Sequence, residues 1–136
     1  MSGFLLDTNV ISEYSRARPP NDSVRRWVDA QKEDALHLSV LTLGEIRKGT
    51  TLLPAGKKRD QLERCLDTGL PARFADRLVP INRQIAEIWG AMAGQAQLES
   101  ITLAIIDGLV AASAKHHGLT VVTQRQGFYC VGSSGD

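Results

Sequence analysis

The chain has 136 residues and carries 16 Lys and Arg against 15 Asp and Glu, so its net charge is +1. This length allows one domain with its own hydrophobic core, and we expect residues 1–136 to form a single domain. The balanced charge gives no sign of a nucleic-acid or membrane partner, although a local patch of basic residues can still bind phosphates. No signal peptide and no apolar run of about 18 residues is found, so we expect a cytoplasmic protein.

Strand-like and helix-like patterns alternate along the chain. Phe4–Leu6 is a short apolar run that predicts a buried strand, and a helical spacing follows it over 9–15. Further on, we predict a helix through Trp27, a strand at 35–40, a helix from Thr42, a helix over 57–70, an edge strand at 78–81, helices over 83–98 and 103–116, and a strand at 119–123. This alternation predicts an α/β fold with a parallel sheet and helices on both faces. Residues 128–136 are expected to form a frayed tail.

Three acidic residues lie in unusually apolar or small-residue surroundings. Asp7 directly follows the first predicted strand, at the carboxyl end where open α/β sheets bind their ligands. Glu45 lies one turn into the helix after the second strand, and Asp107 lies within an otherwise apolar helix. If the first two strands are neighbours, Asp7 and Glu45 share one edge of the sheet, and a helix packed above that edge would bring Asp107 to them.

Each acid also has a structural explanation. Asp7 could cap the first helix. The other two could form ion pairs: Glu45 with Arg47 or Lys48, and Asp107 with Arg83 or Lys115. The remaining acids, including Glu33 and Asp67, lie among polar residues and are expected on solvated faces.

Taken together, the three acids are better explained by a shared cation. Clustered carboxylates repel one another, and a divalent cation removes the repulsion. Oxygen ligands select magnesium or manganese over zinc. Such an ion can bind a phosphodiester oxygen and activate a water for in-line attack.

The segments around the three acids resemble those of a known family. Residues 5–13, 38–49 and 106–112 resemble PIN-domain ribonucleases, and the match is best to the VapC/FitB-like toxins of type II toxin–antitoxin pairs. Residues 80–90 and 117–123 are similar to further parts of that subfamily. The resemblance implies a three-layer α/β/α sandwich with a central parallel sheet. It also implies an endoribonuclease that uses Mg²⁺ or Mn²⁺, a homodimer, and a cognate antitoxin whose tail covers the active site.

The resemblance also implies roles for individual residues. Asp7, Glu45 and Asp107 take the catalytic, metal-binding positions, and Thr8, Asn9 and Thr123 take supporting polar positions. We name Arg16, Arg18 and Lys48 as candidates for RNA contact, with a solvated helix face as the alternative for such basic residues.

One segment departs from the family pattern. The family follows its last strand with Thr-Arg-Asn-x-x-Asp-Phe, which supplies a fourth acid and an asparagine. This chain has Thr123-Gln124-Arg125-Gln126-Gly127-Phe128, which supplies neither. Two functions therefore stay open: a metal-dependent endoribonuclease toxin, or a catalytically weakened PIN-fold module that binds an antitoxin or RNA without cleavage.

Overall fold

A five-stranded sheet forms the centre of the molecule. The computed structural model describes residues 3–15, 22–123 and 129–131. The strands are β1 (Phe4–Leu6), β2 (Leu36–Ser39), β3 (Leu78–Val79), β4 (Thr120–Thr123) and β5 (Tyr129–Val131), arranged in the order β3-β2-β1-β4-β5. The first four strands are parallel, and β5 is antiparallel to β4. The predicted parallel sheet is confirmed, with β3 at its edge as expected.

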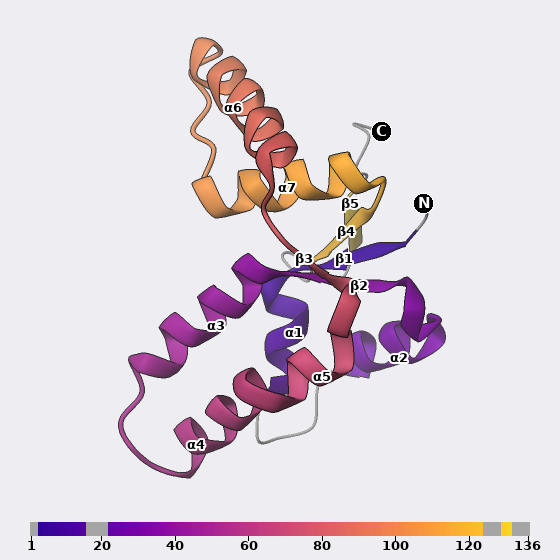
Figure 1. Cartoon of the computed structure of the whole chain (residues 1–136), viewed down its shortest axis with the longest axis vertical. Helices are drawn as coiled ribbons and strands as arrows, with labels where there is room; N and C mark the ends of the chain where they lie inside the picture. Colours follow the sequence, from indigo (N-terminus) through magenta and orange to yellow (C-terminus); the bar gives the residue numbers. More distant parts are fainter. Residues whose placement is uncertain (1–2, 16–21, 124–128, 132–136) are drawn as a thin grey trace.

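Helices cover both faces of this sheet. The helices are α1 (Thr8–Ser15), α2 (Asp22–Ala30), α3 (Val40–Thr51), α4 (Lys57–Arg64), α5 (Leu70–Phe74), α6 (Arg83–Leu98) and α7 (Ile105–His117). Short 3₁₀ turns span Glu33–Ala35 and Ala75–Arg77, and a π-helical turn spans Cys65–Gly69. Figure 1 shows α1 to α5 on one side of the sheet and α6 and α7 on the other. This arrangement is the predicted three-layer α/β/α sandwich.

The alternation of side chains along β1 divides the core into two parts. Leu6 points into a cluster with residues of α1, α2, α3 and α5, in which Phe74 is fully buried. Leu5 points the other way, into a cluster with Ile85 of α6 and Val110 of α7. Because both leucines are buried, β1 has no solvated face, as expected for a central parallel strand.

Several element boundaries differ from the predicted ones. Helix α3 begins at Val40 instead of Thr42, because the buried Ser39 side chain accepts a hydrogen bond from the Leu41 amide (3.1 Å) and caps the helix. The expected helix over 57–70 is divided into α4, the π-helical turn and α5. Helix α6 has the predicted bounds, and Gly118 ends α7 in the left-handed region (φ 67°). Strand β5 was not predicted and occupies three residues of the segment expected to fray.

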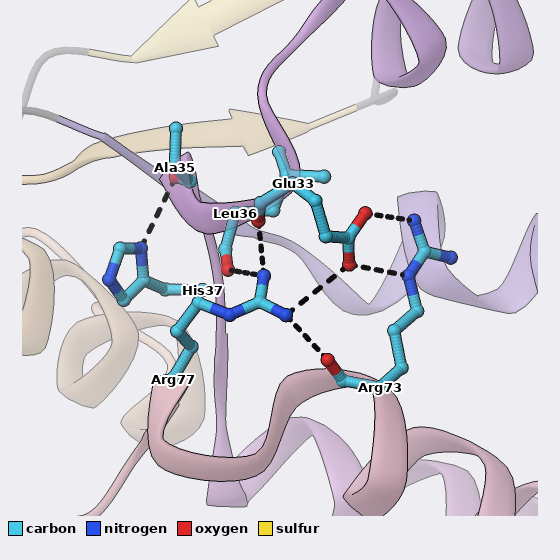
Figure 2. Close-up of polar contacts among 6 residues, drawn as sticks. All are labelled: Glu33, Ala35, Leu36, His37, Arg73 and Arg77. Carbon is cyan, nitrogen blue, oxygen red and sulfur yellow. Dashed lines mark hydrogen bonds and ion pairs between the residues drawn. The ribbon is translucent and has the colours of Figure 1, made fainter.

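Two arginines bind Glu33 at the amino end of β2 (Figure 2). Arg73 donates to both carboxylate oxygens, at 2.9 and 3.1 Å. Arg77 donates to the carbonyls of Glu33 and Leu36 and lies 3.4 Å from the Glu33 carboxylate. We call Glu33, Arg73 and Arg77 the Glu33 clamp. Glu33 is exposed, as predicted, and it also binds these two arginines, which come from a segment about forty residues away in the sequence.

No helix in the described ranges is long and apolar enough to cross a membrane.

Candidate active site

Asp7 joins the end of β1 to the beginning of α1. Its amide donates to the Val122 carbonyl of β4 (2.8 Å), and its carbonyl accepts from the amides of Val10 and Ile11. Its carboxylate accepts a hydrogen bond from the Thr123 hydroxyl (3.1 Å). The β1–β4 register, with Leu6 opposite Val122, places Asp7 and Thr123 at the same height on the carboxyl edge of the sheet. Thr123 therefore lies beside Asp7, where the sequence analysis expected a supporting residue.

Glu45 reaches the same edge from α3. Thr8, the neighbour of Asp7 in the chain, donates a short hydrogen bond from its hydroxyl to the Glu45 carboxylate. The same hydroxyl lies 3.4 Å from the hydroxyl of Thr42. Glu45 therefore contacts the residue that follows Asp7 in the chain, at the same edge of the sheet.

The structure does not support an ion pair as the explanation of Glu45. Arg47, its expected partner, binds Asp67 instead. Across the described ranges Glu45 forms no ion pair, and its side chain is partly exposed.

Asp107 approaches from the opposite layer. It lies in the first turn of α7 and is partly buried, in a position where the helix dipole favours a negative charge. Its expected partner Arg83 pairs with Glu87 (3.1 Å). Within the described part of the chain, no three Asp, Glu, His or Cys side chains lie close enough to hold one metal ion. Asp107 is therefore not gathered with Asp7 and Glu45 into a three-ligand cluster, and the metal roles stay predictions.

Gly108, the residue after Asp107, lies close to the indole of Trp89. A Cβ atom on Gly108 would lie 3.0 Å from Cδ1 and 3.1 Å from Nε1 of Trp89. It would also lie 3.1 Å from a methyl carbon of Leu103. Glycine at this position therefore allows α6 and α7 to pack closely beside the first turn that carries Asp107, and the partly buried Trp89 packs against the core.

The other predicted residues have different outcomes. Asn9 of α1 and Lys48 of α3 are exposed. Arg16 and Arg18 lie outside the described residues, as does the departing segment 124–128.

Sequence reasoning assigned no site role to Thr42, which is buried with 1% of its surface exposed. Its position in the sequence could have suggested such a role, because Thr42 lies three residues before Glu45 and both therefore lie on one side of a helix.

A cavity lies away from these acids. It has a volume of about 200 Å³ and is lined by His37, Asp76, Leu78, Val79, Pro80, His117 and Leu119, none of which was a predicted site residue. Burial lowers the pKa of His117, with smaller contributions from the nearby His116 and His37. Nε2 of His117 is buried and has no hydrogen-bond partner among the described residues. His116 and His117 both lie in the last turn of α7, and His117 also faces this cavity.

Comparison with known families identifies the fold. The PIN domain model matches residues 4–132. The chain is a member of the PIN-domain family. Among its relatives, toxin FitB of Neisseria gonorrhoeae is 38% identical over 92% of this chain and 89% of its own. The VapC ribonuclease Y4jK of Sinorhizobium fredii is 35% identical over 88% of this chain and 85% of its own.

Solved structures agree with this assignment. This PIN domain superposes on the crystal structure of FitAcB from Neisseria gonorrhoeae with a TM-score of 0.80 and 39% identity, covering 91% of this chain and 88% of that one. FitAB bound to an IR36 DNA fragment also gives a TM-score of 0.80, with 36% identity over 90% and 85% of the two chains. The resemblance to VapC/FitB-like PIN domains is confirmed.

Proposed function

We propose that this PIN domain is an endoribonuclease, the toxin of a type II toxin–antitoxin pair, which hydrolyses RNA phosphodiester bonds with a divalent metal ion. Its similarity to toxin FitB and to the VapC ribonuclease supports the class of reaction. The observation that carries the proposal is that Asp7 and Glu45 lie at the same carboxyl edge of the sheet, where each carboxylate accepts a hydrogen bond from a threonine hydroxyl.

The chemistry of these residues fits Mg²⁺ or Mn²⁺. Carboxylate oxygens are the ligands that such ions prefer. Asp7 and Glu45 would hold the ion, with Asp107 as the third acid, while Thr8 and Thr123 orient the first two carboxylates. When bound, the ion would stabilise charge on the phosphate and lower the pKa of a water molecule. Thr8 fixes the orientation of the Glu45 carboxylate, and Thr123 fixes that of the Asp7 carboxylate.

Partners follow from the same relatives. FitAB has been solved bound to a DNA fragment, and VapBC-5 of Mycobacterium tuberculosis is a member of a family of toxin–antitoxin systems, so we infer a cognate antitoxin for this chain. From the family resemblance we also infer a homodimer. The exposed Lys48 lies one turn from Glu45 on α3, which makes it a candidate for contact with an RNA phosphate. Arg16 and Arg18 are further candidates.

A second candidate function rests on residues 124–126. Gln124, Arg125 and Gln126 supply no carboxylate where the family has its fourth acid. A PIN fold without that acid could bind an antitoxin or RNA and cleave weakly or not at all, because a neutral ligand holds a second ion poorly.

RNA cleavage by purified variants tests the first function. With Mg²⁺ or Mn²⁺, we expect the wild-type protein to cleave RNA and Asp7→Asn to lose cleavage while keeping its circular dichroism spectrum. Asp67→Asn is the matched control, because Asp67 is an exposed acid paired with Arg47. Equal cleavage by wild type and Asp7→Asn would contradict the assignment of Asp7 as a catalytic residue. A wild-type protein that binds its antitoxin tightly and cleaves nothing would favour the second function.

A further inference from the structure

Thr42 is a buried hydroxyl that the site described above does not yet use. It lies in the first turn of α3 with 1% of its surface exposed, three residues before Glu45. Its hydroxyl oxygen lies 3.4 Å from that of Thr8, which in turn contacts the Glu45 carboxylate. The three side chains therefore form one chain of polar contacts from the interior to the acid.

The number of protons fixes the direction of this chain. A hydroxyl has a single proton, so Thr8 can donate to only one of its two neighbours. An ionised carboxylate only accepts, whereas the Thr42 hydroxyl can donate as well as accept. The Thr8 proton therefore lies toward Glu45, and Thr42 donates its own proton to the Thr8 oxygen.

A buried threonine can also satisfy its hydroxyl within its own helix. Thr50, on the same helix and 2% exposed, does so by donating to the Ile46 carbonyl (2.8 Å). Across the described residues Thr42 makes no such bond, and its only hydroxyl contact is Thr8. The two threonines thus have equal burial and different partners.

We propose that Thr42 is a positioning residue for the metal-binding edge. By donating to Thr8, it holds the Thr8 proton on one oxygen of Glu45 and leaves the other oxygen for a cation. Residues that hydrogen-bond to a metal ligand and orient it contribute in this way to metal affinity and activity. This inference rests on the proposed function, because it assigns Thr42 a role at the same site.

Matched variants of the two threonines provide the test. Thr42→Val removes the hydroxyl at nearly constant volume, Thr42→Ser keeps it, and Thr50→Val removes a hydroxyl of equal burial that does not face Glu45. We expect Thr42→Val to weaken Mn²⁺ binding in calorimetric titration by roughly 10-fold, with a matching fall in the rate of RNA cleavage. Thr42→Ser should stay near the wild type, and Thr50→Val should lose stability to urea without losing Mn²⁺ affinity.

A crystal structure of Thr42→Val gives a second readout that needs neither metal nor RNA. We expect the Thr8 hydroxyl to turn away from Glu45 in that variant. Wild-type Mn²⁺ affinity in Thr42→Val, equal losses in Thr42→Val and Thr50→Val, or an unmoved Thr8 would overturn the proposal for Thr42. Failure of the proposed function itself is seen separately, as a wild-type protein that neither binds Mn²⁺ nor cleaves RNA.

Discussion

Acidic residues at the two edges of the parallel sheet have different hydrogen-bond and ion-pair partners. At the amino edge, Glu33 is bound by the guanidinium groups of Arg73 and Arg77, which lower the pKa of its carboxyl. At the carboxyl edge, Glu45 receives a hydrogen bond from Thr8 and forms no ion pair within the described ranges. One acid is paired with two cationic side chains, and the other is oriented by a neutral hydroxyl.

This difference separates an acid that joins the fold together from an acid suited to bind a cation. Glu33 connects the start of β2 to the segment before β3, and its charge is already matched. A hydroxyl donor fixes the geometry of a carboxylate without cancelling its charge, so Glu45 keeps its attraction for a metal ion. Changes at the amino edge should therefore affect stability, and changes at the carboxyl edge should affect metal binding and cleavage.

The largest effect on stability is expected for Arg77→Ala. The Arg77 side chain is 17% exposed and donates to the carbonyls of Glu33, Leu36 and Arg73, which would lose these bonds. We expect a loss of about 2–3 kcal/mol in the free energy of unfolding, measured by urea denaturation. The control Arg83→Ala removes an exposed pair with Glu87 and should cost about 0.5 kcal/mol or less. Similar losses in the two variants would contradict a structural role for the Glu33 clamp.

A smaller loss is expected for Gly108→Ala. The new methyl group would press on the Trp89 indole and on Leu103, which should cost about 1–3 kcal/mol and shift the turn that carries Asp107. Combining it with Trp89→Phe, which removes the contacted five-membered ring, should recover part of that stability. Trp89→Phe alone should cost little in hydrogen bonding, because the buried Nε1 has no hydrogen-bond partner within the described ranges. A Gly108→Ala protein as stable as the wild type would show that α6 and α7 do not pack this closely.

The smallest effect is a pH dependence from His117. Its pKa is lowered in the folded protein, so the unfolded chain takes up a proton first as the pH falls. The contribution of His117 to stability is therefore complete above its unfolded pKa of 6.5 and is lost as the pH falls below that value. Urea denaturation at pH 7.5 and at lower pH should show this loss in the wild type and a flatter dependence in His117→Gln. An equal dependence in both proteins would assign the loss to other groups.

Much of the fold follows from local patterns in the sequence. The apolar run of Phe4–Leu6, the stripe of α6 and the glycine after α7 each specify an element within a few residues. The Glu33 clamp and the Thr8–Glu45 contact join residues 37 to 44 positions apart, and no periodicity reveals which side chains will meet at that separation. Strand β5 likewise depends on pairing with β4, so its own three residues did not predict it.

Part of the candidate site could likewise be predicted from the sequence, and part could not. The strand-to-helix turn at Asp7 and the position of Glu45 after β2 were predictable, because parallel strands bring their carboxyl ends together. The role of Thr42 was not, since it depends on a hydroxyl of another helix. The family resemblance supplied the substrate class, which no residue pattern alone could specify.

Calorimetric titration with Mn²⁺ of Glu45→Gln and Glu33→Gln tests the central claim most directly. The two variants remove one negative charge each, from opposite edges of the same sheet. We predict that the wild type and Glu33→Gln bind Mn²⁺ with similar affinity and that Glu45→Gln loses at least about 10-fold in affinity. Equal Mn²⁺ affinity in all three proteins, or a loss confined to Glu33→Gln, would contradict a metal site at the carboxyl edge.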